Sequence, residues 1–182
     1  MIASEKILLA LTSTSQGHTE EIKKIVWKIF DKEPNINVLA NESRDRLPIF
    51  SFYIEVLHYN LAVQILNDRF GIQTRGGCSC AGTYSHLLLD VGKTKSKHIT
   101  KNIDEGNLSL KPGWIRLSLH PIMLNKEVMY VMNSISDLAQ NFKEWSKDYK
   151  YVSKTNEFEF IAENLSCKNK KRAENWFELS LI

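Results

Sequence analysis

The spacing of apolar side chains predicts three amphipathic helices and a weaker fourth one. The first helix begins after a polar loop, at Thr19, and ends at a Glu-Pro-Asn stretch that interrupts its apolar stripe. The second starts near Leu57 and is ended by Gly71, a residue suited to the left-handed position after a helix. The third starts at Asn125 and carries one apolar stripe as far as Tyr149. The four helices are expected over residues 19–30, 57–70, 95–105 and 125–149.

Alternating apolar and polar positions predict four strands between these helices. The clearest is GWIRLSL, residues 113–119, which turns Arg116 to the face opposite Ile115 and Leu117. Because strands and helices are interleaved without regular βαβ spacing, the pattern favours an α+β fold. We expect a small antiparallel or mixed sheet of about four strands, with helices packed on one face. The shorter strands are expected over residues 36–40, 47–54 and 71–75.

The chain of 182 residues is long enough for one domain with short additions at its ends. We expect a lead segment at residues 1–18, a domain at 19–149 and a C-terminal extension at 150–182. The apolar pattern weakens in the extension, where a hairpin or a helix is expected.

Charge and composition exclude several classes of partner. A net charge of +3 is too small to indicate a nucleic-acid partner. The apolar run at residues 7–11 is too short to span a membrane and lacks the flanks of a signal peptide. Three cysteines form no disulfide framework and indicate a reducing compartment. We therefore expect a cytoplasmic protein without a membrane or nucleic-acid partner.

The stretch GIQTRGGCSCAGTY, residues 71–84, carries the most distinctive chemistry. Its paired glycines permit a tight turn, and Arg75 would stabilise a thiolate on Cys78 or Cys80. An inert, buried thiol is the alternative, since cysteine is often buried. No metal site is expected, because the two thiols lack a second cluster of ligands. A disulfide between them would close a strained ring.

Arg116 is the second candidate for chemistry. If its face of the strand lines a cleft, the planar guanidinium suits a carboxylate; if that face is solvated, it is an ordinary surface arginine. His120 follows in the same strand and precedes Pro121. It either lines the mouth of the same cleft or is an ordinary turn histidine.

Together these motifs resemble the C-terminal small domain of class V aminotransferases, the pyridoxal-phosphate enzymes that include cysteine desulfurases. The family pattern has an arginine and then, five residues later, a cysteine before a small residue, matched here by Arg75 and Cys80. Its second landmark is a strand arginine followed two residues later by serine, matched by Arg116 and Ser118. The order of the elements also agrees, over residues 19–145.

The resemblance implies roles for individual residues. Cys80 corresponds to the loop cysteine that, in desulfurases, takes sulfur from a cysteine–pyridoxal adduct as a persulfide. Arg116 corresponds to the arginine that binds the α-carboxylate of the amino-acid substrate, and Arg75 would lie beside the thiol. Cys78 and His120 are expected as active-site neighbours. Desulfurase or selenocysteine-lyase chemistry and aminotransferase or other lyase chemistry both stay open.

The resemblance also implies what another part of such an enzyme supplies. In the family, a larger preceding domain holds pyridoxal 5′-phosphate through a lysine Schiff base, and no lysine of this chain is assigned that role. That large domain, in the full-length protein or in a separate chain, would complete an enzyme that is usually a homodimer. We therefore expect this chain alone to bind no cofactor and to be inactive. The alternative is a non-catalytic binding or regulatory module with a Cys-x-Cys thiol or metal site.

Overall fold

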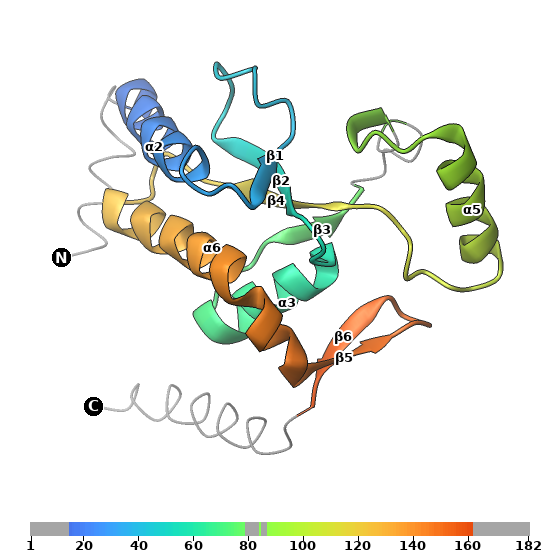
Figure 1. Cartoon of the computed structure of the whole chain (residues 1–182). Coiled ribbons are helices and arrows are strands. Elements are labelled where there is room, and N and C mark those ends of the chain that lie inside the picture. The colour runs from blue at the N-terminus through green and yellow to red at the C-terminus, as the bar shows by residue number, and fades with distance from the viewer. Residues whose placement is uncertain (1–14, 79–83, 85–86, 162–182) are drawn as a thin grey trace.

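The computed structural model describes residues 15–78, 84 and 87–161 and shows an α+β fold (Figure 1). No helix in these ranges combines the length and the apolar character that crossing a membrane requires. The elements follow one another as α2 (Ser15–Phe30), β1 (Ile36–Val38), β2 (Ile49–Ile54), α3 (Tyr59–Phe70), β3 (Arg75–Gly77), α5 (Lys93–Asp104), β4 (Trp114–Ser118), α6 (Asn125–Trp145), a 3₁₀ turn (Ser146–Asp148), β5 (Tyr149–Val152) and β6 (Glu157–Phe160).

The first four strands form an antiparallel sheet in the order β1-β2-β4-β3. The register between the two central strands places Phe50 opposite Leu117 and Phe52 opposite Ile115. All four side chains are buried, so this face of the sheet is the core face. The alternation predicted for the arginine-bearing strand is confirmed.

Helices α2, α3 and α6 cover the core face, as expected from the sequence, and α6 contacts both of the others (Figure 1). Their apolar stripes interlock with the sheet in one cluster of buried side chains. Helix α5 lies apart from this layer, near the end of the sheet where β3 stops and β4 starts (Figure 1). The fully buried members of the cluster include Ile22, Val26, Ile65, Leu66, Val128, Met132, Ile135 and Leu138.

The second predicted helix is confirmed at its end. Gly71 follows α3 in the left-handed conformation, with φ of 66°. Its N–H donates to the Asn67 carbonyl at 2.9 Å, and the N–H of Ile72 donates to the Leu66 carbonyl at 3.1 Å. The start of the first helix was predicted wrongly. Helix α2 begins at Ser15, so Thr19 lies inside it. A tertiary contact explains the longer helix, because the His18 ring hydrogen-bonds through Nε2 to the Met123 carbonyl at 2.7 Å.

Two further boundaries differ from the prediction. The strand expected at residues 71–75 instead occupies Arg75–Gly77. Tyr149, expected at the end of the last helical stripe, is the first residue of β5. Both boundaries depend on short turns and aromatic packing. These two causes leave no periodic pattern in the sequence from which a boundary could be predicted.

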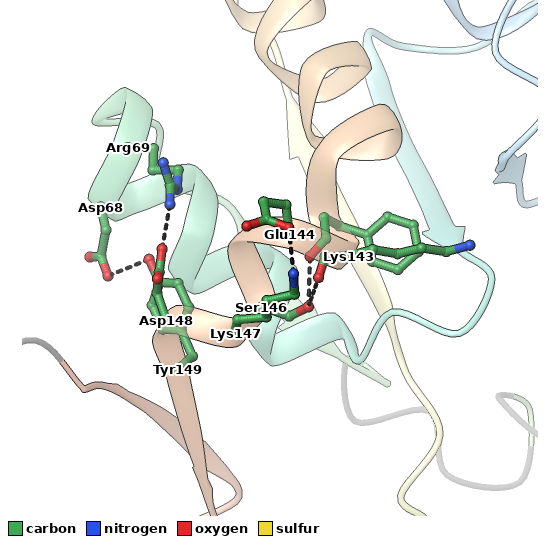
Figure 2. Close-up of polar contacts among 9 residues, drawn as sticks. Asp68, Arg69, Lys143, Glu144, Ser146, Lys147, Asp148 and Tyr149 are labelled. Atoms are coloured by element: carbon green, nitrogen blue, oxygen red, sulfur yellow. Dashed lines mark hydrogen bonds and ion pairs between the residues drawn. The ribbon is translucent and has the colours of Figure 1, made fainter.

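Residues 149–160 form the β5–β6 hairpin, one of the two forms expected for the extension, and this hairpin contacts α3. The rest of the predicted extension, from residue 162, lies outside the described residues. Two polar contacts join the beginning of the hairpin to the end of α3 (Figure 2). Tyr149 donates from its hydroxyl to Asp68 at 3.2 Å, and Arg69 forms a 2.7 Å ion pair with Asp148. Burial, and after it the charge of Asp68, raises the pKa of Tyr149.

Candidate functional site

Arg75 and Arg116 lie directly opposite each other on the neighbouring strands β3 and β4. On the other side of β4, Ser51 of β2 lies opposite Arg116. Directly opposed residues of antiparallel strands project from the same face of a sheet. These three side chains therefore share the face that points away from the helical layer, called here the open face.

The two arginines carry like charges, and no carboxylate of the described residues forms an ion pair with either of them. Within the described ranges, neither Arg75 nor Arg116 forms an ion pair, whereas Arg44 and Arg69 each pair with an aspartate. Arg116 is half-buried and Arg75 is exposed. A guanidinium that is partly withdrawn from water, beside a second one, is a ready partner for an anion.

Three glycines form a slot for the ring of Tyr59, the first residue of α3. A Cβ added at Gly113 would lie 2.6 Å from two ring atoms of Tyr59, and one at Gly76 would lie 3.0 Å from a third. Gly77 adopts a positive φ of 118°, which side-chain-bearing residues rarely adopt. The paired glycines thus have a packing reason, since the ring lies against the backbone of β3 and of the residue before β4.

Asn156, in the loop of the β5–β6 hairpin, holds the hydroxyl end of that ring. Its backbone is left-handed, with φ of 60°, and its side chain is buried. Its Nδ2 donates to the Tyr59 hydroxyl at 2.9 Å, and its Oδ1 accepts from the Tyr151 hydroxyl at 3.0 Å. Its main-chain carbonyl accepts a further bond from the side chain of Asn60. Asn156 is therefore hydrogen-bonded to two residues at the start of α3 and to one residue of β5 in its own hairpin.

His58, at the N-terminal end of α3, packs together with Tyr59, Tyr151 and Asn156, and this group is called here the Tyr59 cluster. Its ring stacks on Tyr59 with centroids 4.5 Å apart and also contacts Tyr151 and Phe158. Its Nδ1 accepts from the N–H of Asn60 at 3.2 Å and so caps the helix. The proton therefore sits on Nε2, which is buried without a hydrogen-bond partner in the part of the chain described. Burial lowers the pKa of His58.

Cys78 directly follows β3 and is half-buried. Burial is the main cause that raises the pKa of Tyr59; the hydrogen bond from Asn156 opposes it, and the nearby charge of Cys78 adds to it. Cys80, the predicted nucleophile, lies outside the described residues. The convergence of its thiol with Arg116 therefore stays a prediction.

His120 is exposed in the turn after β4. Its Nδ1 accepts from the N–H of Ile122 at 3.1 Å, and its carbonyl accepts from the N–H of Met123 at 2.9 Å. These bonds give His120 a local role in shaping the turn, and its place in an active site stays a prediction.

Lys23, the buried lysine of the described ranges, does not fit a Schiff-base role. It is paired with Glu20 at 2.6 Å and Asp45 at 3.4 Å. The hydrogen bond to Glu20 raises the pKa of Lys23, whereas an imine-forming lysine needs a lowered pKa. A metal also finds no cluster of three candidate ligands within the described residues.

Sequence reasoning did not single out Tyr59 or Asn156. Two signals point toward them in retrospect. Gly113, directly before the strand that pairs with β3, marks a second place where a bulky group approaches the backbone. Asn156, in a polar turn between two aromatic strands, is a residue type that tolerates the left-handed conformation.

Comparison with known proteins does not place the chain in a family: no family model matches it, and no curated protein gives a significant match. The geometry of the arginine pair and of the Tyr59 cluster is therefore the basis for assigning a function.

Proposed function

We propose that this chain is the small domain of a pyridoxal-phosphate enzyme of the class V aminotransferase type. In it, Arg116 binds the carboxylate of an amino-acid substrate, and Arg75 assists. One observation carries this proposal: the two arginines lie directly opposite each other on the open face. Neither has a carboxylate partner within residues 15–78, 84 and 87–161.

The energetics of the pair favour an anion as its natural partner. Like charges directly opposite each other on neighbouring strands destabilise a sheet, by about 0.2–1 kcal/mol. A carboxylate between the two guanidinium groups replaces that repulsion with charge-assisted hydrogen bonds, the stronger class of such bonds. The planar fork of arginine also fixes the orientation of the carboxylate, which a transferase or lyase acting on amino acids requires.

In such an enzyme, pyridoxal phosphate supplies the electron sink for amino-acid chemistry. Because Lys23 does not fit the Schiff-base role, we place the cofactor on a large domain, in the same protein or in a separate chain. This chain would then bind carboxylates without turnover on its own. A cytoplasmic homodimer acting on amino acids belongs to the same proposal.

Both subclasses of chemistry fit this arrangement. Of the candidate residues in this chain, desulfurase or selenocysteine-lyase chemistry would use the thiol of Cys80 as a nucleophile as well as the carboxylate-binding arginine. Aminotransferase chemistry would use that arginine and take the cofactor and its lysine from the large domain. Arg116 is therefore the residue on which the test is best centred.

The test is a titration followed by NMR of the arginine Nε–H groups at low ionic strength. Cysteine, alanine and acetate are added in turn, and alaninamide serves as the probe without a carboxylate. We expect saturable shifts at Arg116 with the three carboxylates and no such shift with the amide. Arg116→Gln should abolish the response, and Arg69→Gln, which alters an arginine already paired with Asp148, should keep it.

Equal responses to alaninamide and alanine would overturn the proposal, as would a carboxylate response that survives Arg116→Gln. A folded chain without any carboxylate response would favour the alternative of a non-catalytic binding or regulatory module.

A further inference from the structure

Strand β3, which leads directly into Cys78, is short and glycine-rich, so its position depends on what packs against it. Strand β3 consists of Arg75, Gly76 and Gly77, and its two glycines contribute no side chain to the core. Glycine inside a strand weakens it, because backbone entropy is lost without side-chain packing in return. The strand pairs with β4 on one side only, since it is the edge of the sheet.

The ring of Tyr59 supplies the missing packing. It fills the space that side chains at Gly76 and Gly113 would occupy, and it is 6% exposed. It therefore holds β3 against the start of β4 from the side of the helices. The position of this ring is fixed by the His58 ring stacked on it and by the hydrogen bond from Asn156 to its hydroxyl.

Asn156 is well suited to hold the ring rigidly. It is one of the few buried polar residues in the described chain, and both ends of its side-chain amide are engaged. A buried amide with satisfied donors and acceptors specifies one arrangement, because any displacement leaves a polar group without a partner. The loop that carries it is closed by an N–H bond from Asn156 to the Val152 carbonyl at 2.9 Å.

We infer that the β5–β6 hairpin is a latch for β3, the strand that leads into the thiol: Asn156 fixes Tyr59 in the glycine slot, and Tyr59 in turn fixes Gly77 and the Cys78 that follows it. Asn156 and Tyr59 are thus positioning residues that limit the access of reagents to the thiol. The functional meaning of the latch rests on the proposed role of this strand in the active site. Its physical part, the coupling of the hairpin to the thiol, is independent of that role.

The experiment measures the alkylation rate of Cys78 in the full chain, with site-resolved mass spectrometry to separate it from the other two cysteines. Asn156→Gly removes the side-chain bonds and keeps the left-handed backbone. Tyr59→Phe keeps the ring and removes the hydroxyl. We expect each variant to raise the rate about tenfold, through more frequent local opening of β3. The double variant should add little, since both changes break the same bond.

Ser134→Ala is the matched control, because it also removes a hydrogen bond of a buried residue, from Ser134 to the Tyr130 carbonyl within α6. Its rate should stay within about twofold of the wild type. An unchanged rate in Asn156→Gly, or an equal rise in Ser134→Ala, would overturn the latch. These outcomes leave the carboxylate titration untouched, and a failed titration leaves the alkylation result standing, so the two proposals fail separately.

Discussion

Asn156 donates a 2.9 Å hydrogen bond from its side-chain amide to the hydroxyl of Tyr59, 97 residues earlier in the chain. The bond joins the last described hairpin to the first residue of α3. Through the ring of Tyr59 it also reaches the glycines of β3 and the start of β4. The C-terminal hairpin is therefore built into the same packing unit as the strands that carry the two arginines.

The glycine slot predicts a large difference between two alanine substitutions. Gly113→Ala places a Cβ 2.6 Å from two ring atoms of Tyr59, so the ring must move, and we expect a loss of about 1–3 kcal/mol in the free energy of unfolding. Gly92→Ala meets no atom within 4 Å and should change stability by less than about 0.5 kcal/mol. Urea denaturation measures both.

The Gly113 penalty should shrink when the ring is absent. In a Tyr59→Ala background, Gly113→Ala is expected to cost less than in the wild type, and a double-mutant cycle isolates this coupling. The part that stays reflects the Gly77 Cα, which would lie 2.9 Å from the added Cβ. A penalty for Gly113→Ala no larger than that for Gly92→Ala would contradict the slot.

The arginine pair predicts that removing one charge stabilises the chain. Arg116→Gln relieves the repulsion from Arg75 and should raise the free energy of unfolding by about 0.2–1 kcal/mol at low ionic strength. High salt should shrink the gain, because it screens the repulsion. Arg69→Gln is the control, and it is expected to lower the free energy of unfolding. It removes an ion pair with Asp148 and a cation–π contact 4.7 Å from the Trp145 ring centroid.

Denaturation at low and at high ionic strength distinguishes the two variants. If Arg116→Gln lowers stability as Arg69→Gln does, the guanidinium of Arg116 has a partner and the open face is not poised for an anion.

Periodicity was enough to predict the architecture. The α+β fold, the sheet of about four strands and the helices on one face follow from apolar spacing, because burial imposes that spacing directly on the sequence. The pattern left an antiparallel or a mixed sheet open, and the structure shows the antiparallel one. The face of Arg116 and the left-handed cap at Gly71 were likewise predicted from local rules.

Periodicity and local rules could not predict the Tyr59 cluster, because it depends on contacts between segments that are distant in the sequence. A tyrosine beside a histidine at a helix start has no periodic signature, and neither does an asparagine in a turn. The paired glycines were attributed to a turn that shapes a thiol, whereas their packing against Tyr59 is a tertiary cause. The same limit explains the wrong start of α2, where a contact between His18 and Met123 overrides a loop-like sequence.

The buried cap at His58 predicts acid sensitivity. Its folded pKa is lowered by burial, so below its usual value of about 6.5 the unfolded chain takes up a proton that the folded chain does not. Stability should therefore fall as the pH falls below about 6.5, by at most roughly 1.4 kcal/mol per pH unit. His58→Asn keeps a good helix cap and should remove this part of the pH dependence.

His120→Asn is the matched control for that measurement. Its ring accepts from the N–H two residues ahead in the same way, but it is exposed. The variant should keep the acid sensitivity of the wild type between about pH 6.5 and 5. A His58→Asn variant with the same acid sensitivity as His120→Asn would rule out His58 as its source.

The raised pKa of Tyr149 predicts that the chain also loses stability at alkaline pH. Burial, and after it the charge of Asp68, raises the pKa of Tyr149 above the unfolded value of 10.0, so the folded chain keeps its phenolic proton where the unfolded chain loses it. The resulting stability is present below about pH 10 and is lost as the pH rises above it, at up to roughly 1.4 kcal/mol per pH unit.

Tyr149→Phe removes the hydrogen bond to Asp68 and should lower the free energy of unfolding by about 1 kcal/mol at neutral pH. The stability of this variant should decline less steeply above about pH 10 than that of the wild type. Tyr130→Phe, which removes a hydroxyl bonded to the Phe70 carbonyl at 2.9 Å, should keep the steep alkaline decline. Denaturation curves from about pH 8 to 11 compare the two variants. If their slopes are the same, the raised pKa of Tyr149 is not the source of the alkaline decline.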